Sequence, residues 1–440
     1  MHKTIGGIFF RVLVSPAIFA AGLAWAQQPA APARPAVATA RVSTAPPRVL
    51  SLADLVRAAL AHNPEIAAYA SRAAALRARI RPAESLPDPT VSAGWMGKPL
   101  PFVLNRAAMT SYRGVSAMET FPFPGKLKLR GRMAERKSRA AWWDYQAVRR
   151  RVVAQLKAAY FQYAYCEQAL AIVGNNRVLL EKLTKIAEAR YQAGKGLQQD
   201  VLKGQLELSQ LLEQIAILQE ERRTAAARIN TLLDRSPQAP LAPPAPLAQT
   251  PLAYTLARLY RLAGADDPGL QRDQRLIERD QDALALAHKS YDPDFSVSTM
   301  FQRMPGGPNM YGAFVGVSIP IFYKSKQRRQ VAAAARSLDS MRSLRANRQT
   351  TVNYLVKQQF LAAEQASRLA VLYSQAIVPQ SSQTLASSEM AYQAGKLDFL
   401  SLLDNFVNLL GYQVNYYRQI SDYQIALARL EPLVGVELAK

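Results

Sequence analysis

The segment Tyr191-Gln192-Ala193-Gly194-Lys195 recurs unchanged as Tyr392-Gln393-Ala394-Gly395-Lys396, 201 residues further along the chain. A second match pairs Asp88-Pro89 with Asp292-Pro293 at an offset of 204. Self-similarity of this kind indicates a duplicated architecture. We therefore predict two structural repeats, residues 51–237 and 252–440, joined by a Pro-rich linker at 238–251.

Each repeat contains two stretches in which apolar residues alternate with small or polar ones, a pattern typical of strands. In the second repeat they fall at about 294–303 and 311–321, and in the first, more weakly, at about 90–98 and 110–121. Strands of about ten residues suit a tilted membrane strand, although soluble hairpins look similar. A closed membrane barrel needs at least about eight strands, so in a membrane several copies would have to share one barrel.

A long helical hairpin is predicted after each strand pair, at 125–235 and 324–432. No Pro occurs between Gly125 and Gln192, and a helix over this stretch would be about 100 Å long. Apolar or small residues at alternating steps of four and three, among them Val152, Leu156 and Cys166, are typical of a coiled-coil seam. We interpret Cys166 as a buried small hydrophobe and expect a kink at Pro379.

The first residues indicate export. Lys3 and Arg11 precede an apolar stretch at 12–23, and Ala24-Trp25-Ala26 supplies the small residues of a cleavage site. Residues 1–26 are therefore predicted to be a cleavable signal peptide, followed at 27–50 by a Pro/Ala-rich leader. No later stretch is long and apolar enough for a transmembrane helix.

Composition weighs against catalysis. The chain has 55 Lys and Arg against 32 Asp and Glu, a net charge of +23, but only three His and one Cys. No Gly-rich phosphate loop, nucleophile motif or metal-ligand spacing is visible, so no enzyme activity, catalytic residue, metal site or cofactor is predicted. A basic excess is compatible with nucleic acid, but no nucleic-acid-binding motif occurs, and export argues against such a partner.

Basic residues are densest immediately after each strand pair, where we predict a cluster at the membrane interface, close to anionic lipid headgroups. A solvated helix face is the alternative interpretation. The cluster comprises Lys126, Lys128, Arg130 and Arg132 in the first repeat and Lys324, Lys326 and Arg328 in the second.

The signal peptide, the duplication, two strands per repeat and a Tyr-x-x-Gly turn at each hairpin together resemble the TolC-type outer-membrane efflux protein family, from about Val49 to Leu438. The resemblance implies a mainly α fold with membrane β: a homotrimer whose 12-stranded β-barrel continues into a long periplasmic α-barrel. It implies location in the outer membrane of a Gram-negative type envelope. The basic Pro-Gly-Lys segment is similar to the heavy-metal branch of the family.

The implied function is that of a passive exit duct in a tripartite efflux pump, exporting small molecules or metal ions. The implied partners are outer-membrane lipid, a periplasmic adaptor and an inner-membrane transporter of the resistance-nodulation-division type. Two alternatives stay open at this point: an outer-membrane channel for type I protein secretion, and a soluble periplasmic coiled-coil adaptor.

The resemblance also assigns roles at the hairpin tips. Its Tyr-x-x-Gly turns lie at the periplasmic tip and correspond here to Tyr191–Gly194 and Tyr392–Gly395. It implies a latch in the form of a hydrogen bond from Tyr392 to Asp200, although a helix-start aspartate is an equal interpretation of Asp200. The acidic ring that lines the family's aperture corresponds to Ser401 and Asp404, so only Asp404 retains the carboxylate. An arginine found in the family five residues after the second tyrosine is replaced by Leu397.

Overall fold

A computed structural model of the chain describes residues 50–96, 111–304 and 307–439. The predicted signal peptide and all of the predicted leader except Leu50 lie outside the described residues, as do positions 97–98 and 110 of the predicted strands.

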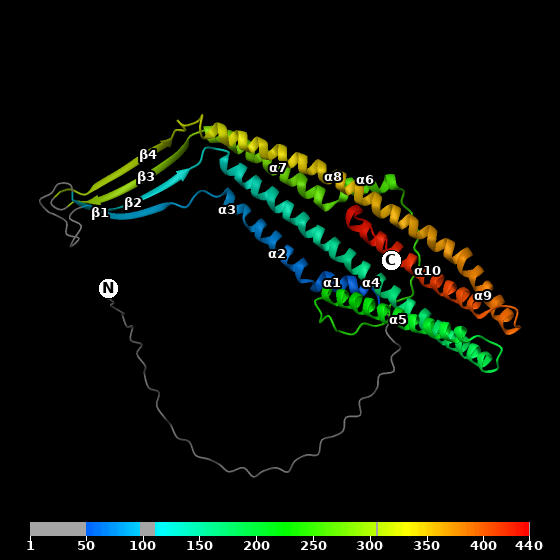
Figure 1. Cartoon of the computed structure of the whole chain (residues 1–440). Coiled ribbons are helices and arrows are strands. Elements are labelled where there is room, and N and C mark those ends of the chain that lie inside the picture. The colour runs from blue at the N-terminus through cyan, green and yellow to red at the C-terminus, as the bar shows by residue number, and fades with distance from the viewer. Residues whose placement is uncertain (1–49, 97–110, 305–306, 440) are drawn as a thin grey trace, which may run out of the picture. The chain divides into compact units, whose positions relative to one another are not determined.

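Four strands form one antiparallel sheet in the order β1-β2-β3-β4 (Figure 1). They are β1 Thr90–Met96, β2 Tyr112–Phe121, β3 Asp294–Arg303 and β4 Met310–Ser318. The strand β4 is shorter than the predicted 311–321, because Pro320 has no N–H with which to continue the ladder.

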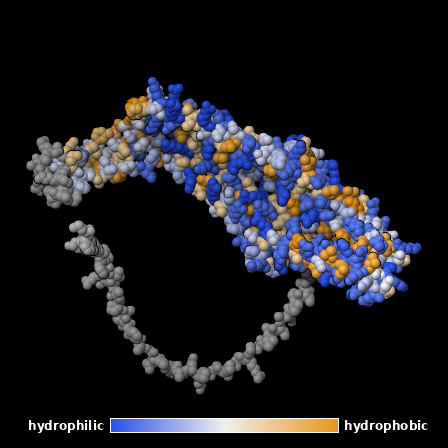
Figure 2. All heavy atoms as spheres, viewed as in Figure 1, coloured by the Kyte–Doolittle hydropathy of each residue, from blue (hydrophilic) through white to orange (hydrophobic). Residues whose placement is uncertain are grey.

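The register places the alternating apolar residues of both repeats on one face of the sheet. Val115 of β2 lies opposite Ala93 of β1 and Phe301 of β3, and Phe301 lies opposite Tyr311 of β4. This face is not covered by the helices: Tyr311 is 78% and Val315 77% exposed. The opposite face carries mainly Gly, Ser and other small or polar side chains; its large apolar or aromatic members are Met96, Tyr112, Met118, Met300, Met310 and Phe314. Figure 2 shows apolar surface extending over the strands.

The helices of the first repeat begin with α1 (Leu52–His62), α2 (Pro64–Ala78) and α3 (Ile80–Glu84). Side-chain caps from Ser51 and Asn63 start α1 and α2, and Pro64 sits at the first helical position, where no N–H is needed. After the strands comes α4 (Lys126–Gln192), which is 67 residues long, and α5 (Gln198–Leu232) returns beside it.

The second repeat has the same plan, with α6 (Leu256–Asp266), α7 (Pro268–His288) and the short 3₁₀ turn η1 (Lys289–Tyr291) before β3. After β4, the chain forms α8 (Gln327–Leu372), a π-helical turn η2 (Tyr373–Ile377), α9 (Val378–Gln393) and α10 (Phe399–Val434). The π turn directly precedes Pro379, where a kink is expected. Among the described residues, no helix combines the length and apolar character needed to cross a bilayer.

The two repeats correspond element by element. The helices α4 and α5 begin 201 residues before α8 and α10, and α1 and α2 begin 204 residues before α6 and α7. The segments α8, η2 and α9, with 46, 5 and 16 residues, together cover the same length as the 67 residues of α4.

Buried apolar residues form two clusters along α4. The first joins Val152 and Leu156 of α4 to Leu259 of α6 and Leu427 of α10. The second, nearer the hairpin tips, includes Cys166 of α4 and Phe406 of α10. Cys166 is fully buried, as predicted, and burial together with the nearby Glu221 raises the pKa of its thiol to about 12. A thiol that stays protonated at neutral pH acts as packing rather than as a nucleophile.

Candidate functional site

The two predicted tip turns have the same backbone structure. The helix ahead of each turn is closed by a hydrogen bond from the glycine N–H to the tyrosine carbonyl: Gly194 N to Tyr191 O is 2.9 Å, and Gly395 N to Tyr392 O is 3.0 Å. Both glycines have positive φ, 69° and 71°, in the left-handed region where a side chain would be strained. The repeated Gly is therefore required by the shape of the turn.

The two tip tyrosines differ in their surroundings. Tyr191 is 45% exposed, whereas Tyr392 is 4% exposed and packs beside Phe399. Arg190, the last basic residue of α4, holds Tyr392 in place: its Nη1 donates to the Tyr392 carbonyl at 2.6 Å, and its guanidinium lies 4.7 Å from the centre of the ring. Arg190 thus joins the tip of the first hairpin to that of the second.

Sequence reasoning missed Arg190. The arginine that the family resemblance leads one to expect, five residues after Tyr392, is Leu397. The structure supplies a guanidinium to Tyr392 from the other repeat. A comparison of the two repeats could have indicated Arg190. The residue before the first repeated pentapeptide is Arg190, whereas the one before the second is Ala391, so the two tips are not equivalent.

Asp200 lies in the first turn of α5, where its carboxylate accepts a hydrogen bond from Leu197 N at 3.4 Å. This is the helix-start role that was its alternative interpretation. Asp200 acts on Tyr392 through its charge. The pKa of the Tyr392 phenol is raised mainly by burial; the positive charge of Arg190 lowers this pKa, and the negative charge of Asp200 raises it further. The carboxylate is therefore near the tyrosine, but the contacts to the ring and the carbonyl of Tyr392 come from Arg190.

The two residues predicted at the aperture lie in the first turns of α10. The Ser401 N–H and hydroxyl both donate to Asp398, each at 2.8 Å, and thereby cap the helix. These bonds lower the pKa of Asp398. Asp404 is exposed, and one carboxylate oxygen accepts from Asn408 Nδ2 at 3.1 Å. Ser401 thus has a local structural role, and Asp404 remains available for a ring.

One member of the predicted membrane-interface cluster requires correction. Lys126 is 6% exposed, and its ammonium donates to the Asp294 carboxylate and to the Asp292 carbonyl, each at 2.8 Å. Asp294 also accepts from Phe123 N at 2.7 Å. Lys126 therefore fixes the start of α4 to the start of β3, and it cannot reach a lipid headgroup, because its charge is buried and paired.

The remaining members of the cluster fall into two groups. Arg132 pairs with Asp282 of α7 at 3.2 Å, and Arg136, nearby on α4, pairs with Glu278 at 2.7 Å. The acidic residues of α7 therefore neutralise part of the basic run on α4. The exposed members of the cluster, to which no carboxylate of the described residues is paired, are Lys128, Arg130, Lys324, Lys326 and Arg328.

Large apolar side chains lie next to this exposed group. Ile319, Ile321 and Phe322, which follow β4 and precede Lys324, are each about 70% exposed. Figure 2 shows hydrophilic surface where α8 begins, beside the apolar surface of the strands. An apolar segment bordered by exposed basic residues is the pattern expected at a membrane–water interface.

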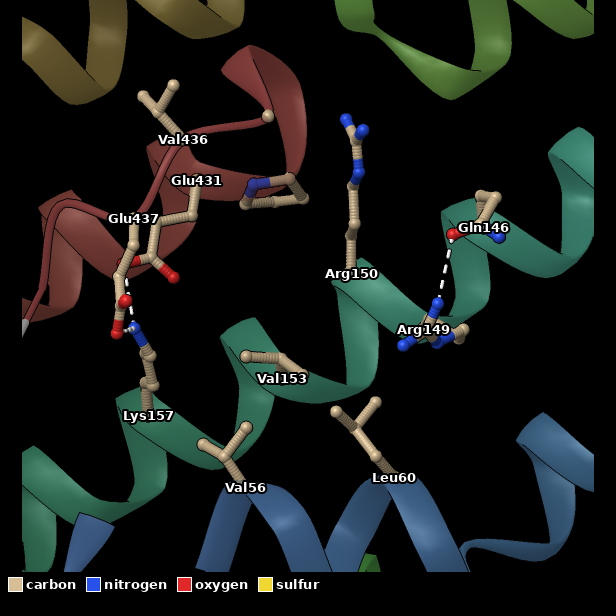
Figure 3. A pocket seen from close by; sticks show the side chains of 12 residues that line it. Val56, Leu60, Gln146, Arg149, Arg150, Val153, Lys157, Glu431, Val436 and Glu437 are labelled. Atoms are coloured by element: carbon tan, nitrogen blue, oxygen red, sulfur yellow. Dashed lines mark hydrogen bonds and ion pairs between the residues drawn. The ribbon is translucent and has the colours of Figure 1, made fainter. Parts of the chain in front are cut away.

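The end of α10 is held by a buried ion pair. Lys157 of α4 donates to Glu431 Oε1 at 2.9 Å and to the Ala439 carbonyl at 2.7 Å, and Glu437 lies 3.2 Å away. Glu431 in turn accepts from the N–H groups of Leu438 and Ala439. Figure 3 shows Lys157 directed at these carboxylates, at one side of a cavity of about 500 Å³. We call this set of contacts the C-terminal clasp.

Comparison with known proteins shows what the chain is similar to. Residues 55–235 match the sequence model of the family described as outer membrane efflux protein. The cobalt-zinc-cadmium resistance protein CzcC of Cupriavidus metallidurans is 23% identical over 325 residues, which cover 71% of this chain and 74% of that protein.

Solved structures share the fold. The outer-membrane channel OprN superposes with a TM-score of 0.75 at 18% identity, covering 87% of this chain and 89% of OprN. The outer membrane protein VceC of Vibrio cholerae gives a TM-score of 0.73 at 16% identity, covering 87% and 95%. These matches confirm the resemblance that the sequence indicates: the chain is similar to the outer membrane efflux protein family over residues 55–235 and shares its fold with solved outer-membrane channels. The matched family and structures are described as efflux proteins and membrane channels, and none of those named above is described as an enzyme.

Proposed function

We propose that the chain is the outer-membrane exit duct of a tripartite efflux pump and works as a homotrimer with a periplasmic adaptor and an inner-membrane transporter. The observation that carries the proposal is the four-stranded sheet. Its apolar face is exposed, and four strands are too few to close a barrel. Three copies would supply the twelve strands of the predicted barrel, leaving the face with small and polar side chains toward its lumen.

The helices support the same assembly. On α8, the large apolar residues Leu344, Tyr354 and Leu361 are between 48% and 62% exposed. An open apolar groove runs between α4 and α5, lined in part by Ala159 and Ile217. Exposed apolar surface of this kind marks sites of association. In the proposed trimer, neighbouring copies cover these surfaces and the helices close into a periplasmic α-barrel.

Divalent metal ions are the first substrate class to test, because the relative CzcC is named for resistance to cobalt, zinc and cadmium. Among the described residues, no group of three metal-ligating side chains is present. The proposed duct would therefore pass ions handed over by its transporter, which the family resemblance implies is of the resistance-nodulation-division type.

Fractionation and conductance test the proposal together. The expressed protein should partition with the outer membrane, require detergent for extraction, cross-link as a trimer and form channels in planar bilayers. Recovery in the soluble periplasmic fraction would instead favour the adaptor alternative. Deletion of the gene should sensitise cells to metal ions; loss of a secreted protein without metal sensitivity would favour type I secretion.

Asp404→Asn is expected to weaken block of the channel by a trivalent cation by about tenfold, because three carboxylates around one axis concentrate negative potential. Single-channel recording at fixed salt measures the block. The matched control is Glu213→Gln, which removes an exposed carboxylate from α5. Unchanged block in Asp404→Asn would exclude a role for this residue at the aperture.

Replacing Lys324, Lys326 and Arg328 with glutamine is expected to reduce insertion into anionic vesicles by up to about a hundredfold at low salt, at about 1 kcal/mol for each charge. Insertion into zwitterionic vesicles should not change. The control variant replaces Arg177, Arg223 and Arg368, which lie on exposed helix faces in short-range ion pairs. Insertion into anionic vesicles equal to that of the wild type would argue for the solvated-face interpretation.

A further inference from the structure

Two arginines face each other on the apolar face of the sheet. The register pairs Arg113 of β2 directly with Arg303 of β3, and on its other side Arg113 lies opposite Trp95 of β1. All three residues belong to the face that exposes Val115, Val297 and Tyr311. Both arginines are exposed.

Two like charges directly opposite each other destabilise a pair of strands, since their Cβ atoms are only about 4.5–5.5 Å apart. Within residues 50–96, 111–304 and 307–439, no carboxylate forms an ion pair with either guanidinium. The arginines of α4 contrast with them, because Arg132 and Arg136 are paired with acidic residues of α7. The arrangement of Arg113 and Arg303 is therefore suited to an anion supplied from outside the described chain.

The position of the pair narrows the identity of this anion. Arg113 and Arg303 lie at the end of the sheet remote from the helices, eight residues along their strands from Phe121 and Phe295. Eight residues of strand cover about 27 Å, or about 20 Å of height at a tilt of about 40°. That is close to the height of the apolar band of a membrane barrel, so the arginines lie at its outer edge.

We propose that Arg113 and Arg303 together bind a phosphate group of a lipid headgroup in the outer leaflet. Guanidinium groups match phosphate oxygens in bidentate geometry, and an indole ring beside them suits the same interfacial depth. The inference rests on the proposed function, because it needs the apolar face of the sheet to lie in the outer membrane. The ligand chemistry is a phosphate group carried by a membrane lipid, and a phosphorylated glycolipid is the probe that tests it.

The test uses the full-length assembly reconstituted in vesicles that contain a phosphorylated glycolipid or its enzymatically dephosphorylated form, with identical acyl chains. Bound glycolipid is counted by native mass spectrometry. The wild-type protein should retain the phosphorylated form about tenfold more than the dephosphorylated one, and Arg113→Gln/Arg303→Gln should reduce this ratio to about one. Arg113→Lys/Arg303→Lys should retain part of the preference.

Thermal stability gives a second readout, because the effect of the glutamine substitutions on the melting temperature should have opposite signs in detergent and in phosphorylated glycolipid. In zwitterionic detergent, the glutamine variant should melt at or above the wild-type temperature, because a like-charge pair has been removed. In phosphorylated glycolipid it should melt below wild type. The control Arg177→Gln/Arg223→Gln makes the same charge change on helix surfaces and should alter neither result.

An unchanged glycolipid ratio in an inserted, trimeric Arg113→Gln/Arg303→Gln variant would overturn the lipid site and leave the proposed function intact. Full competition by inorganic phosphate at equal concentration would also overturn it, in favour of a free-anion site. Failure of the wild-type protein to insert into any vesicle would overturn both proposals.

Discussion

Arg190→Ala is expected to raise the ratio of open to closed channels by about thirtyfold. Arg190 provides two contacts to Tyr392, a charge-assisted hydrogen bond of 2.6 Å to its carbonyl and a guanidinium 4.7 Å from the ring centre. After allowance for partial exposure, we assign these contacts about 2 kcal/mol together. If they hold the tips in the closed state, their loss shifts the equilibrium by that amount. Single-channel recording in planar bilayers measures the open probability.

Two further variants separate Arg190 from the latch that the family resemblance implies. Tyr392→Phe retains the ring and the carbonyl and removes only the hydroxyl, with which Arg190 also interacts, so a latch made by Arg190 should weaken only in part. If the latch is instead a hydrogen bond from the Tyr392 hydroxyl to Asp200, Tyr392→Phe should raise the open probability as much as we expect for Arg190→Ala. The control is Arg177→Ala, which removes an exposed α4 arginine paired only with Glu181 four residues away. Opening in Tyr392→Phe with none in Arg190→Ala would assign the latch to Asp200.

Lys157→Met is expected to destabilise the C-terminal clasp by about 3 kcal/mol. The substitution leaves the Glu431 carboxylate, whose side chain is 11% exposed, without the ammonium that lies 2.9 Å away. Removing one partner of a buried ion pair costs about 3–5 kcal/mol. We take the lower value because Glu431 keeps two backbone donors, from Leu438 and Ala439.

Hydrogen exchange at residues 435–439 and at the end of α10 measures this effect, which should exceed a hundredfold in rate. The double variant Lys157→Met/Glu431→Gln should recover part of the loss, because the buried charge is removed as well. The control Arg223→Ala breaks a pair whose side chains are both 68% exposed, and it should cost less than about 0.5 kcal/mol. Equal exchange in Lys157→Met and wild type would contradict the clasp.

Local patterns were sufficient to predict the strands and the long helices. The alternation in Phe295–Phe301 and the seam through Val152 and Leu156 are properties of neighbouring residues, and the structure places both as periodicity indicates. The repeated pentapeptide likewise fixed the tip turns, because only a glycine suits their backbone. The strand end at Ser318 was missed, although Pro320 was visible in the sequence.

Long-range charge pairing could not be predicted in this way. Lys126 was interpreted as a headgroup contact, but it is paired with Asp294, 168 residues later. Part of the basic run on α4 is neutralised by Glu278 and Asp282, which lie on a helix of the other repeat and far along the chain. Arg190 and Tyr392 are separated by 202 residues. Only the packing of one repeat against the other brings these groups together.

The equal lengths of α4 and of the span from α8 through α9 limit which insertions and deletions the sequence can tolerate. Both spans have 67 residues, and the contact between Arg190 and Tyr392 requires their ends to meet. An insertion of four residues in α4 alone would advance its end by about 6 Å and rotate it by more than a full turn. Insertions and deletions should therefore survive only as compensating pairs, one in each repeat. A homologue of different duct length should have gained or lost the same number of residues in both halves.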